Sequence, residues 1–167
     1  MKNFLAGALC AIALVAIVLA AYLGLGFMEV AADAKPSACE AALMTPSVHA
    51  AVRRQAPAMQ NPLPDADATR IAGGKLYMDD CVGCHGGPGQ PPSAFGLSFY
   101  PPAPQFAHAG SQYTEAQLFW VARHGIRMSG MFPQPHYSDS DLWSLVSFIS
   151  HIRNLPPAVV KAVQASN

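Results

Sequence analysis

The chain begins with a long apolar stretch. From Phe4 to Phe27 it contains no charged residue. A helix of that length measures about 36 Å and crosses a hydrocarbon core of about 30 Å with some tilt. A secretory signal has a shorter apolar core of about 7–15 residues, although Ala32-Asp33-Ala34 resembles a small-residue cleavage site. The pattern favours a retained membrane anchor over residues 1–27, with a cleaved signal as the alternative.

The next segment changes to Ala, Pro and small polar residues. Residues 28–69 are predicted to form a linker rather than a domain. Within this linker, a short helix is expected over residues 47–59, after Pro46 and with Pro57 as its stop. The run Asn61-Pro62-Leu63-Pro64 then predicts an extended entry into the folded part.

Helical spacing of apolar residues returns after the linker. A helix is predicted over residues 68–81, where Gly73, Tyr77 and Cys81 align one turn apart. A second helix is predicted over residues 114–124. Thr114 as N-cap and Gln117 three residues later form a capping box for it, and Gly125 is its expected stop.

A third helix is expected from Ser138 or Ser140 to Pro156-Pro157, with six apolar residues at helical spacing. Before it, residues 86–110 hold six prolines and five glycines, which predicts a long irregular loop. Such a loop is normally functional or wraps around something. No segment alternates as a strand would, so the fold class is all-α, with a domain over residues 70–157 and a short tail over 158–167. So small a domain buries only a modest core unaided.

The charged residues bear on possible partners and on the orientation of the apolar stretch in a membrane. The sequence has ten Lys and Arg against ten Asp and Glu, and no basic stripe, so nucleic acid is not an expected partner. Lys2 precedes the apolar stretch, whereas Glu29 and Asp33 follow it. The positive-inside rule then leaves the amino terminus in the cytoplasm and exports the remainder.

The candidate chemistry lies in Cys81-Val82-Gly83-Cys84-His85, a C-x-x-C-H motif typical of covalent haem attachment. The two thiols add to two vinyl groups on one porphyrin edge, and His85 becomes the proximal iron ligand. A thioredoxin-like site would need a βαβ pattern, which is absent. A zinc site would need four ligands, and no second pair follows. Cys10 and Cys39 receive no role.

The second axial ligand is expected to be Met131, in the tight segment Ser129-Gly130-Met131-Phe132-Pro133, with Met128 as the runner-up. Four other histidines are further candidates that are favoured less. One of them, His124, is expected to cap its helix. The four are His108, His124, His136 and His151. Four residues flank the methionine segment and are candidates for contacts with haem propionates, with core packing or solvent exposure as the alternative: Trp120, Arg123, Arg127 and Tyr137.

These motifs together resemble a class I c-type cytochrome, over residues 71–157. The resemblance implies three to four helices around one covalent haem c. It also implies that Gly73 and Tyr77 face Leu145 and Phe148 where two helices cross. A loop carbonyl, of Pro91 or Pro92, is expected to accept a hydrogen bond from the proximal histidine. In the family, proline usually follows the methionine directly, whereas here Phe132 intervenes.

The expected function is one-electron transfer between membrane-associated redox partners, not catalysis. The expected location is the cytoplasmic (inner) membrane, with one span and the haem domain on its periplasmic side. The alternative is a tightly bound subunit of a larger membrane oxidoreductase, such as a dehydrogenase or a terminal oxidase. A third hypothesis, a haem enzyme or gas sensor, would need an open iron site.

Overall fold

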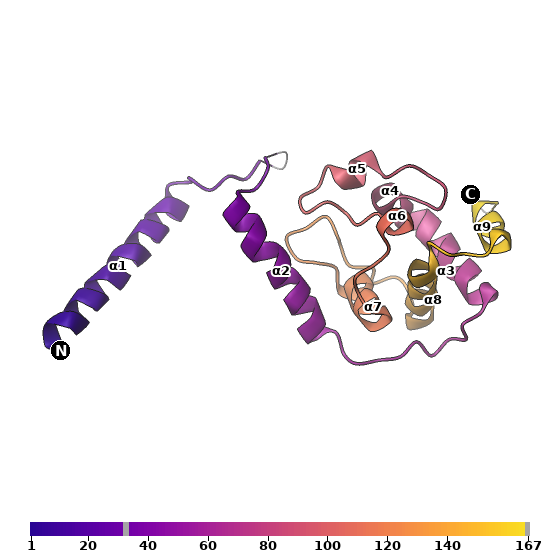
Figure 1. The fold of residues 1–167 in the computed structure, drawn as a ribbon, viewed down its shortest axis with the longest axis horizontal. Coiled ribbons are helices and arrows are strands. Elements are labelled where there is room, and N and C mark those ends of the chain that lie inside the picture. Colours follow the sequence, from indigo (N-terminus) through magenta and orange to yellow (C-terminus); the bar gives the residue numbers. More distant parts are fainter. Residues whose placement is uncertain (32–33, 166–167) are drawn as a thin grey trace. The chain divides into compact units, whose positions relative to one another are not determined.

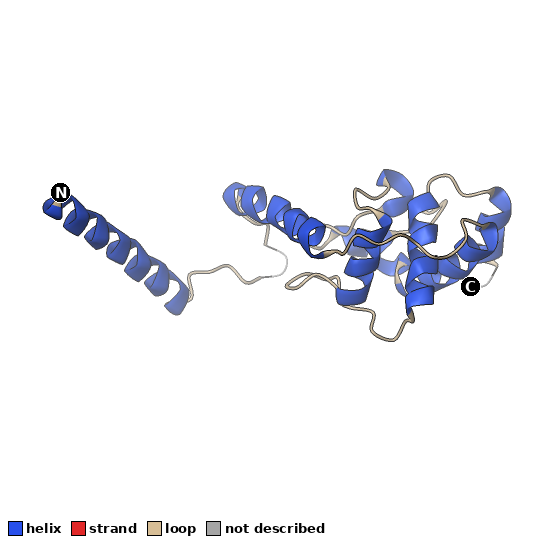
Figure 2. Cartoon of the chain, turned by 90° about the horizontal axis from the view of Figure 1, so that it is seen from below, coloured by secondary structure: helices blue, strands red, loops and turns tan. Residues whose placement is uncertain are grey.

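The computed structural model describes residues 1–31 and 34–165, and all its regular elements in these ranges are helices (Figures 1 and 2). This confirms the all-α prediction. The chain divides into two compact units, residues 1–34 and 35–167. Ala32 and Asp33 of the expected cleavage site lie outside the described residues.

The first unit consists of helix α1, Lys2–Gly24. Its side chains are exposed along its whole length, and its length and apolar composition are sufficient to cross a membrane. A signal sequence near an N-terminus has the same properties. The predicted apolar helix is therefore confirmed, and it is consistent with a membrane anchor.

The second unit is built on a close contact between α3, Asp67–Asp80, and α8, Asp139–His151. A Cβ atom on Gly73 would lie 1.9 Å from the carbonyl oxygen of Ser144, so the two helix backbones touch there. One turn further on, the rings of Tyr77 and Phe148 pack with centroids 5.2 Å apart. The predicted pairing of these two helices is confirmed.

Helix α7, Glu115–His124, completes the core against α8. Its capping box joins Thr114 and Gln117 as predicted, and it stops at Gly125, whose φ is +68°. Phe119 of α7 stacks on Trp143 of α8 with ring centroids 4.4 Å apart. Helix α8 starts with its own capping box between Ser138 and Asp141, which resolves the choice left open between Ser138 and Ser140.

The C-terminal segment differs from the predicted tail. Helix α9, Pro157–Gln164, packs against α3. Val159 is fully buried and Val163 is 1% exposed. A Cβ atom on Gly74 would lie 2.4 Å from a methyl group of Val163. The two valines are four residues apart and therefore share one helix face.

The predicted linker also differs from the structure. Helix α2, Ala38–Gln55, begins nine residues before the expected helix, at a cap where Ser37 accepts a hydrogen bond from the backbone N–H of Glu40. Pro46 lies inside this helix and does not precede it. Val52 of α2 is 2% exposed, and His49 Nδ1 lies 2.6 Å from the hydroxyl of Tyr113, which precedes α7. Helix α2 is thus part of the second unit.

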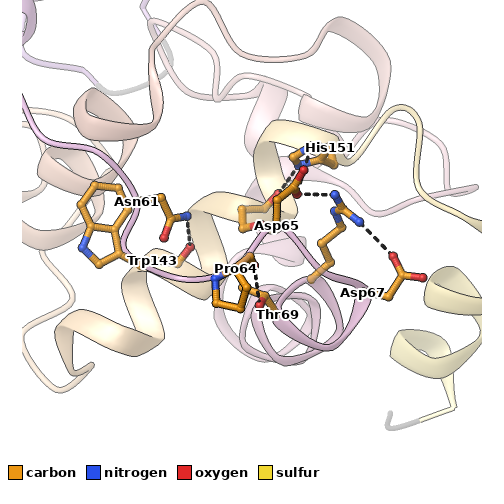
Figure 3. A network of polar contacts seen from close by, with 9 residues as sticks. Asn61, Pro64, Asp65, Asp67, Thr69, Trp143 and His151 are labelled. Atoms are coloured by element: carbon orange, nitrogen blue, oxygen red, sulfur yellow. Dashed lines mark hydrogen bonds and ion pairs between the residues drawn. The ribbon is translucent and has the colours of Figure 1, made fainter.

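The segment between α2 and α3 is held by polar contacts (Figure 3). The side-chain amide of Asn61 donates to the carbonyl of Trp143 at 3.2 Å, and Thr69 donates to the carbonyl of Pro64 at 2.9 Å. Asp65 forms an ion pair with Arg70 and lies 3.7 Å from His151. The extended entry predicted from the prolines is therefore fixed along α8 and the start of α3.

The contact of α3 with α8 predicts a large effect of Gly73→Ala. The added methyl group would overlap a backbone carbonyl that cannot rotate away, so we expect a loss of more than about 3 kcal/mol in the free energy of unfolding. Urea unfolding of the haem-loaded domain measures this loss. Ala72→Val adds bulk at the exposed neighbouring position and should cost less than about 1 kcal/mol. Equal effects of the two substitutions would contradict the backbone contact.

Val52→Ala is predicted to weaken the packing of α2 against the rest of the second unit. Two buried methyl groups are lost, and their burial contributes roughly 1.5 kcal/mol. If α2 opens locally, trypsin should cleave after Arg53 or Arg54 about tenfold faster. Leu43→Ala on the same helix is the control, because Leu43 is 63% exposed. The docking of α2 would be refuted by cleavage that is no faster in Val52→Ala than in the control.

Candidate functional site

The C-x-x-C-H motif lies directly at the end of α3. Cys81 is the C-cap of α3 and also the N-cap of the one-turn helix α4, Val82–His85. The backbone N–H groups of Cys84 and His85 both donate to the carbonyl of Cys81, at 3.1 and 2.9 Å. Because α3 is fixed against α8, this turn holds the two cysteines and the histidine at a defined place in the domain.

His85 is oriented by two contacts. Its Nδ1 lies 2.8 Å from the carbonyl oxygen of Pro104, and its ring stacks on Phe106 with centroids 4.7 Å apart. Burial lowers the pKa of His85, an effect that the hydrogen bond to Pro104 opposes. A neutral imidazole that donates from Nδ1 has its Nε2 lone pair free, which is the form that binds a metal.

The acceptor for His85 is therefore Pro104, and the prediction of Pro91 or Pro92 is wrong. Both of those prolines are exposed. The loop after them turns back against the motif through the short helix α5, Ala94–Leu97, and only then reaches Pro104 and helix α6, Phe106–Ala109. Figure 1 shows α4, α5 and α6 gathered together.

Gln105 joins this loop to the motif. Its side-chain amide donates to the carbonyls of Cys84 and Ala103 at 2.9 and 3.0 Å, and its oxygen accepts from the backbone N–H of Ser93 at 2.7 Å. Gln105 is 7% exposed. A buried side chain with three backbone partners fixes the loop in one conformation.

Two glycines allow the loop to approach the motif. A Cβ atom on Gly96 would lie 1.7 Å from the carbonyl oxygen of Cys84. Gly86, directly after the motif, has φ +68°, and its carbonyl accepts a hydrogen bond from the buried hydroxyl of Tyr77 at 2.6 Å. The aromatic residue predicted on α3 thus also holds the chain just after His85.

The environment of Cys81 differs from that of a redox nucleophile. Burial, with the nearby Asp80 and Cys84, raises the pKa of Cys81 to about 12. Thioredoxin-like catalysis needs a lowered cysteine pKa. In the described part of the chain, no three His, Cys, Asp or Glu side chains are grouped as metal ligands. Neither a thioredoxin-like site nor a zinc site fits this arrangement.

The segment with Met131 is a second, tightly bonded loop. A Cβ atom on Gly125 would lie 2.6 Å from the carbonyl oxygen of Met131, which itself accepts from the backbone N–H of Ile126 at 2.8 Å. The N–H of Gln134 donates to the carbonyl of Ala122 at 3.0 Å. Met131 is half-buried, whereas Met128 is 92% exposed.

The two loops meet at Gly130. A Cβ atom there would lie 3.1 Å from the ring of Phe99, and Phe99 packs edge-on against Phe95 with centroids 4.9 Å apart. Both phenylalanines belong to the Pro/Gly-rich loop that also carries Pro104 and Gln105. The loop that carries Met131 thus contacts the Pro/Gly-rich loop through aromatic side chains.

Most of the remaining candidate residues contact other parts of the protein. His108 contacts the carbonyl of Gln90, His124 packs on Trp120, and His151 contacts the carbonyl of Ser147. His136 and Tyr137 both contact Asp80, and Arg123 donates to the carbonyl of Tyr137. Arg127 is exposed.

Comparison with known proteins identifies the type of domain that carries the motif. Residues 68–149 match the family model described as cytochrome c oxidase, cbb3-type, subunit III. The chain carries a class I c-type cytochrome domain. No curated protein and no solved structure gave a significant match.

Covalent haem c is expected for a cytochrome domain of this family. The residues fit this group. Cys81 and Cys84 are unbridged thiols, and His85 Nε2 forms no hydrogen bond with the described residues. Of the residues that orient the motif, Pro104, Gln105 and Phe106 were not found from the sequence. They lie in an aperiodic loop, and no motif in a single sequence distinguishes them from its other prolines and polar residues.

Gln105→Ala should destabilise the cytochrome domain markedly. The substitution leaves one N–H and two carbonyl groups without their partner, and we expect a loss of roughly 2–4 kcal/mol in the free energy of unfolding. The measurement is urea unfolding of the haem-loaded protein. Gln90→Ala, at an exposed position of the same loop, is the control and should stay within about 0.5 kcal/mol of the parent. A similar stability of the two variants would show that Gln105 does not hold the loop.

Proposed function

We propose that this chain is a membrane-anchored mono-haem electron carrier, with His85 and Met131 as the two axial ligands of the haem iron. The observation that carries the proposal is the orientation of His85. Its Nδ1 faces the carbonyl of Pro104 and its ring lies on Phe106, so Nε2 is left for the iron. Cys81 and Cys84 would form the thioether bonds.

The role of the protein in electron transfer is to hold the two axial ligands in fixed positions. When bound, the haem supplies a one-electron couple, and six-coordinate iron with fixed ligands needs little reorganisation. Gln105 and Tyr77 hold the chain on either side of His85. The bonds of Ile126 and Gln134 hold the Met131 loop. Among the two methionines, the half-burial of Met131 favours it over the exposed Met128.

We also propose on which side of the membrane the cytochrome domain lies. Covalent haem attachment is expected outside the cytoplasm, and the charges around α1 favour export of everything after it. We therefore place the cytochrome domain on the periplasmic face of the cytoplasmic membrane, with α1 retained as the anchor.

The docking of α2 favours partners close to the membrane. Between Gly24 of α1 and Ala38 of α2 the chain spans at most about 50 Å. A free linker from residue 28 to residue 69 would reach about three times as far. A short reach suits a membrane-embedded donor or acceptor.

The family description favours a second candidate, a permanent subunit of a membrane oxidase or a related oxidoreductase. Purification of the full chain in a mild detergent separates the two. A monomer that is reversibly reduced by one electron supports the carrier. Co-purification with further haem-containing subunits at fixed stoichiometry supports the subunit. A purified chain without covalent haem would exclude both.

Met131→Ala should open the sixth coordination position. Methionine ligation raises the potential of a His-ligated haem, so we expect the reduction potential to fall by on the order of 0.1 V or more. The reduced variant should bind carbon monoxide, and the parent should not. Spectroelectrochemistry and carbon monoxide titration measure the two effects. Met128→Ala is the control and should match the parent, and a parental potential in Met131→Ala would exclude Met131 as the ligand.

A further inference from the structure

The loop over residues 125–137, here called the Met131 loop, is joined to the end of α3 by the carboxylate of Asp80. The hydroxyl of Tyr137 donates to Asp80 Oδ2, and His136 Nε2 lies 3.3 Å from the same oxygen. Asp80 is the last residue of α3 and immediately precedes Cys81. Among the hydrogen bonds of the described residues, these two join the loop over residues 125–137 to α3.

Tyr137 is held on its other side by α7. Arg123 donates from Nη1 to the carbonyl of Tyr137 at 2.8 Å and forms an ion pair with Asp139 through Nη2. The ring of Tyr137 packs against the hydrophobic core. The backbone of Tyr137 is thus tied to α7 and its hydroxyl to α3.

This geometry matters because the two proposed ligands belong to two segments that the contacts of Asp80 join. His85 follows α3 through α4, whereas Met131 belongs to a loop whose other hydrogen bonds lead to α7 or remain within the loop. A neutral thioether is a weak ligand, so its occupancy of the iron depends on how firmly the loop is held in place.

We propose that Asp80 and Tyr137 are positioning residues that hold the Met131 loop closed on the haem site. The inference rests on the proposed Met131 ligation. Burial and the hydrogen bond to Asp80 raise the pKa of Tyr137 above its ordinary value, so the phenol remains a donor. A hydrogen bond to an ionised carboxylate is stronger than one between two neutral groups.

The test measures how easily an added ligand displaces the methionine. Imidazole is titrated into the oxidised, haem-loaded full chain, and the loss of the weak red absorption band typical of methionine bound to ferric iron is followed. Tyr137→Phe and Asp80→Ala each remove the contact, and each should bind imidazole roughly three- to tenfold more tightly than the parent. Asp80→Asn keeps an acceptor oxygen and should lie between the parent and Asp80→Ala.

Asp79→Ala is the matched control. It removes a carboxylate from the same last turn of α3, one residue away, and no hydrogen bond found among the described residues joins this carboxylate to the loop. Its imidazole affinity should equal that of the parent. Combining Asp80→Ala with Tyr137→Phe should add little to Asp80→Ala alone, because Asp80→Ala already removes the bond to Tyr137.

The outcomes separate positioning from ligation and from general stability. Parental imidazole affinity in Tyr137→Phe and Asp80→Ala, with the red band lost in Met131→Ala, would overturn the positioning role and leave the ligation standing. A red band that persists in Met131→Ala would overturn both. Urea unfolding is measured in parallel: an affinity change that Asp79→Ala reproduces at equal loss of stability would also overturn the proposal.

Discussion

The backbone contact between Gly73 and Ser144 is the constraint from which the site follows. It places α3 on α8 with no side chain between them, and the pair of Tyr77 and Phe148 fixes the rotation of one helix on the other. Because α3 runs into Cys81 without an intervening loop, the position of α3 also sets the position of the turn that carries the C-x-x-C-H motif. Any change in the packing of the two helices is therefore transmitted to His85.

The two loops of the site are fixed by a different means. They contain few core residues, and their conformations depend on side chains that bond to backbone groups. Gln105 bonds three such groups on the proximal side. On the other side, backbone bonds of Ile126 and Gln134 and the side chain of Arg123 have the same role. A small domain with a modest core can hold long loops in this way, since each buried polar partner removes an alternative conformation.

The sequence predicted those parts of the domain whose signals are local. The capping box at Thr114, the glycine stop at Gly125 and the helical spacing of Gly73 with Tyr77 all operate within a few residues, and each appears in the structure. The acceptor for His85 did not follow from the sequence. Pro91, Pro92 and Pro104 are equivalent in composition, and the choice among them depends on the turn of the loop through α5, which is a tertiary effect.

The same distinction explains the two segments that were predicted as linker and tail. Val159 and Val163 share a helix face, but only two turns of such a pattern precede the end of the chain, too little to distinguish a packed helix from a frayed one. In α2, Pro46 indicated a helix start, whereas Ser37 provides the cap. Packing of Val52 and the contact of His49 with Tyr113 hold the longer helix. These contacts make α2 part of the folded unit, so tertiary packing decides where the domain begins along the chain.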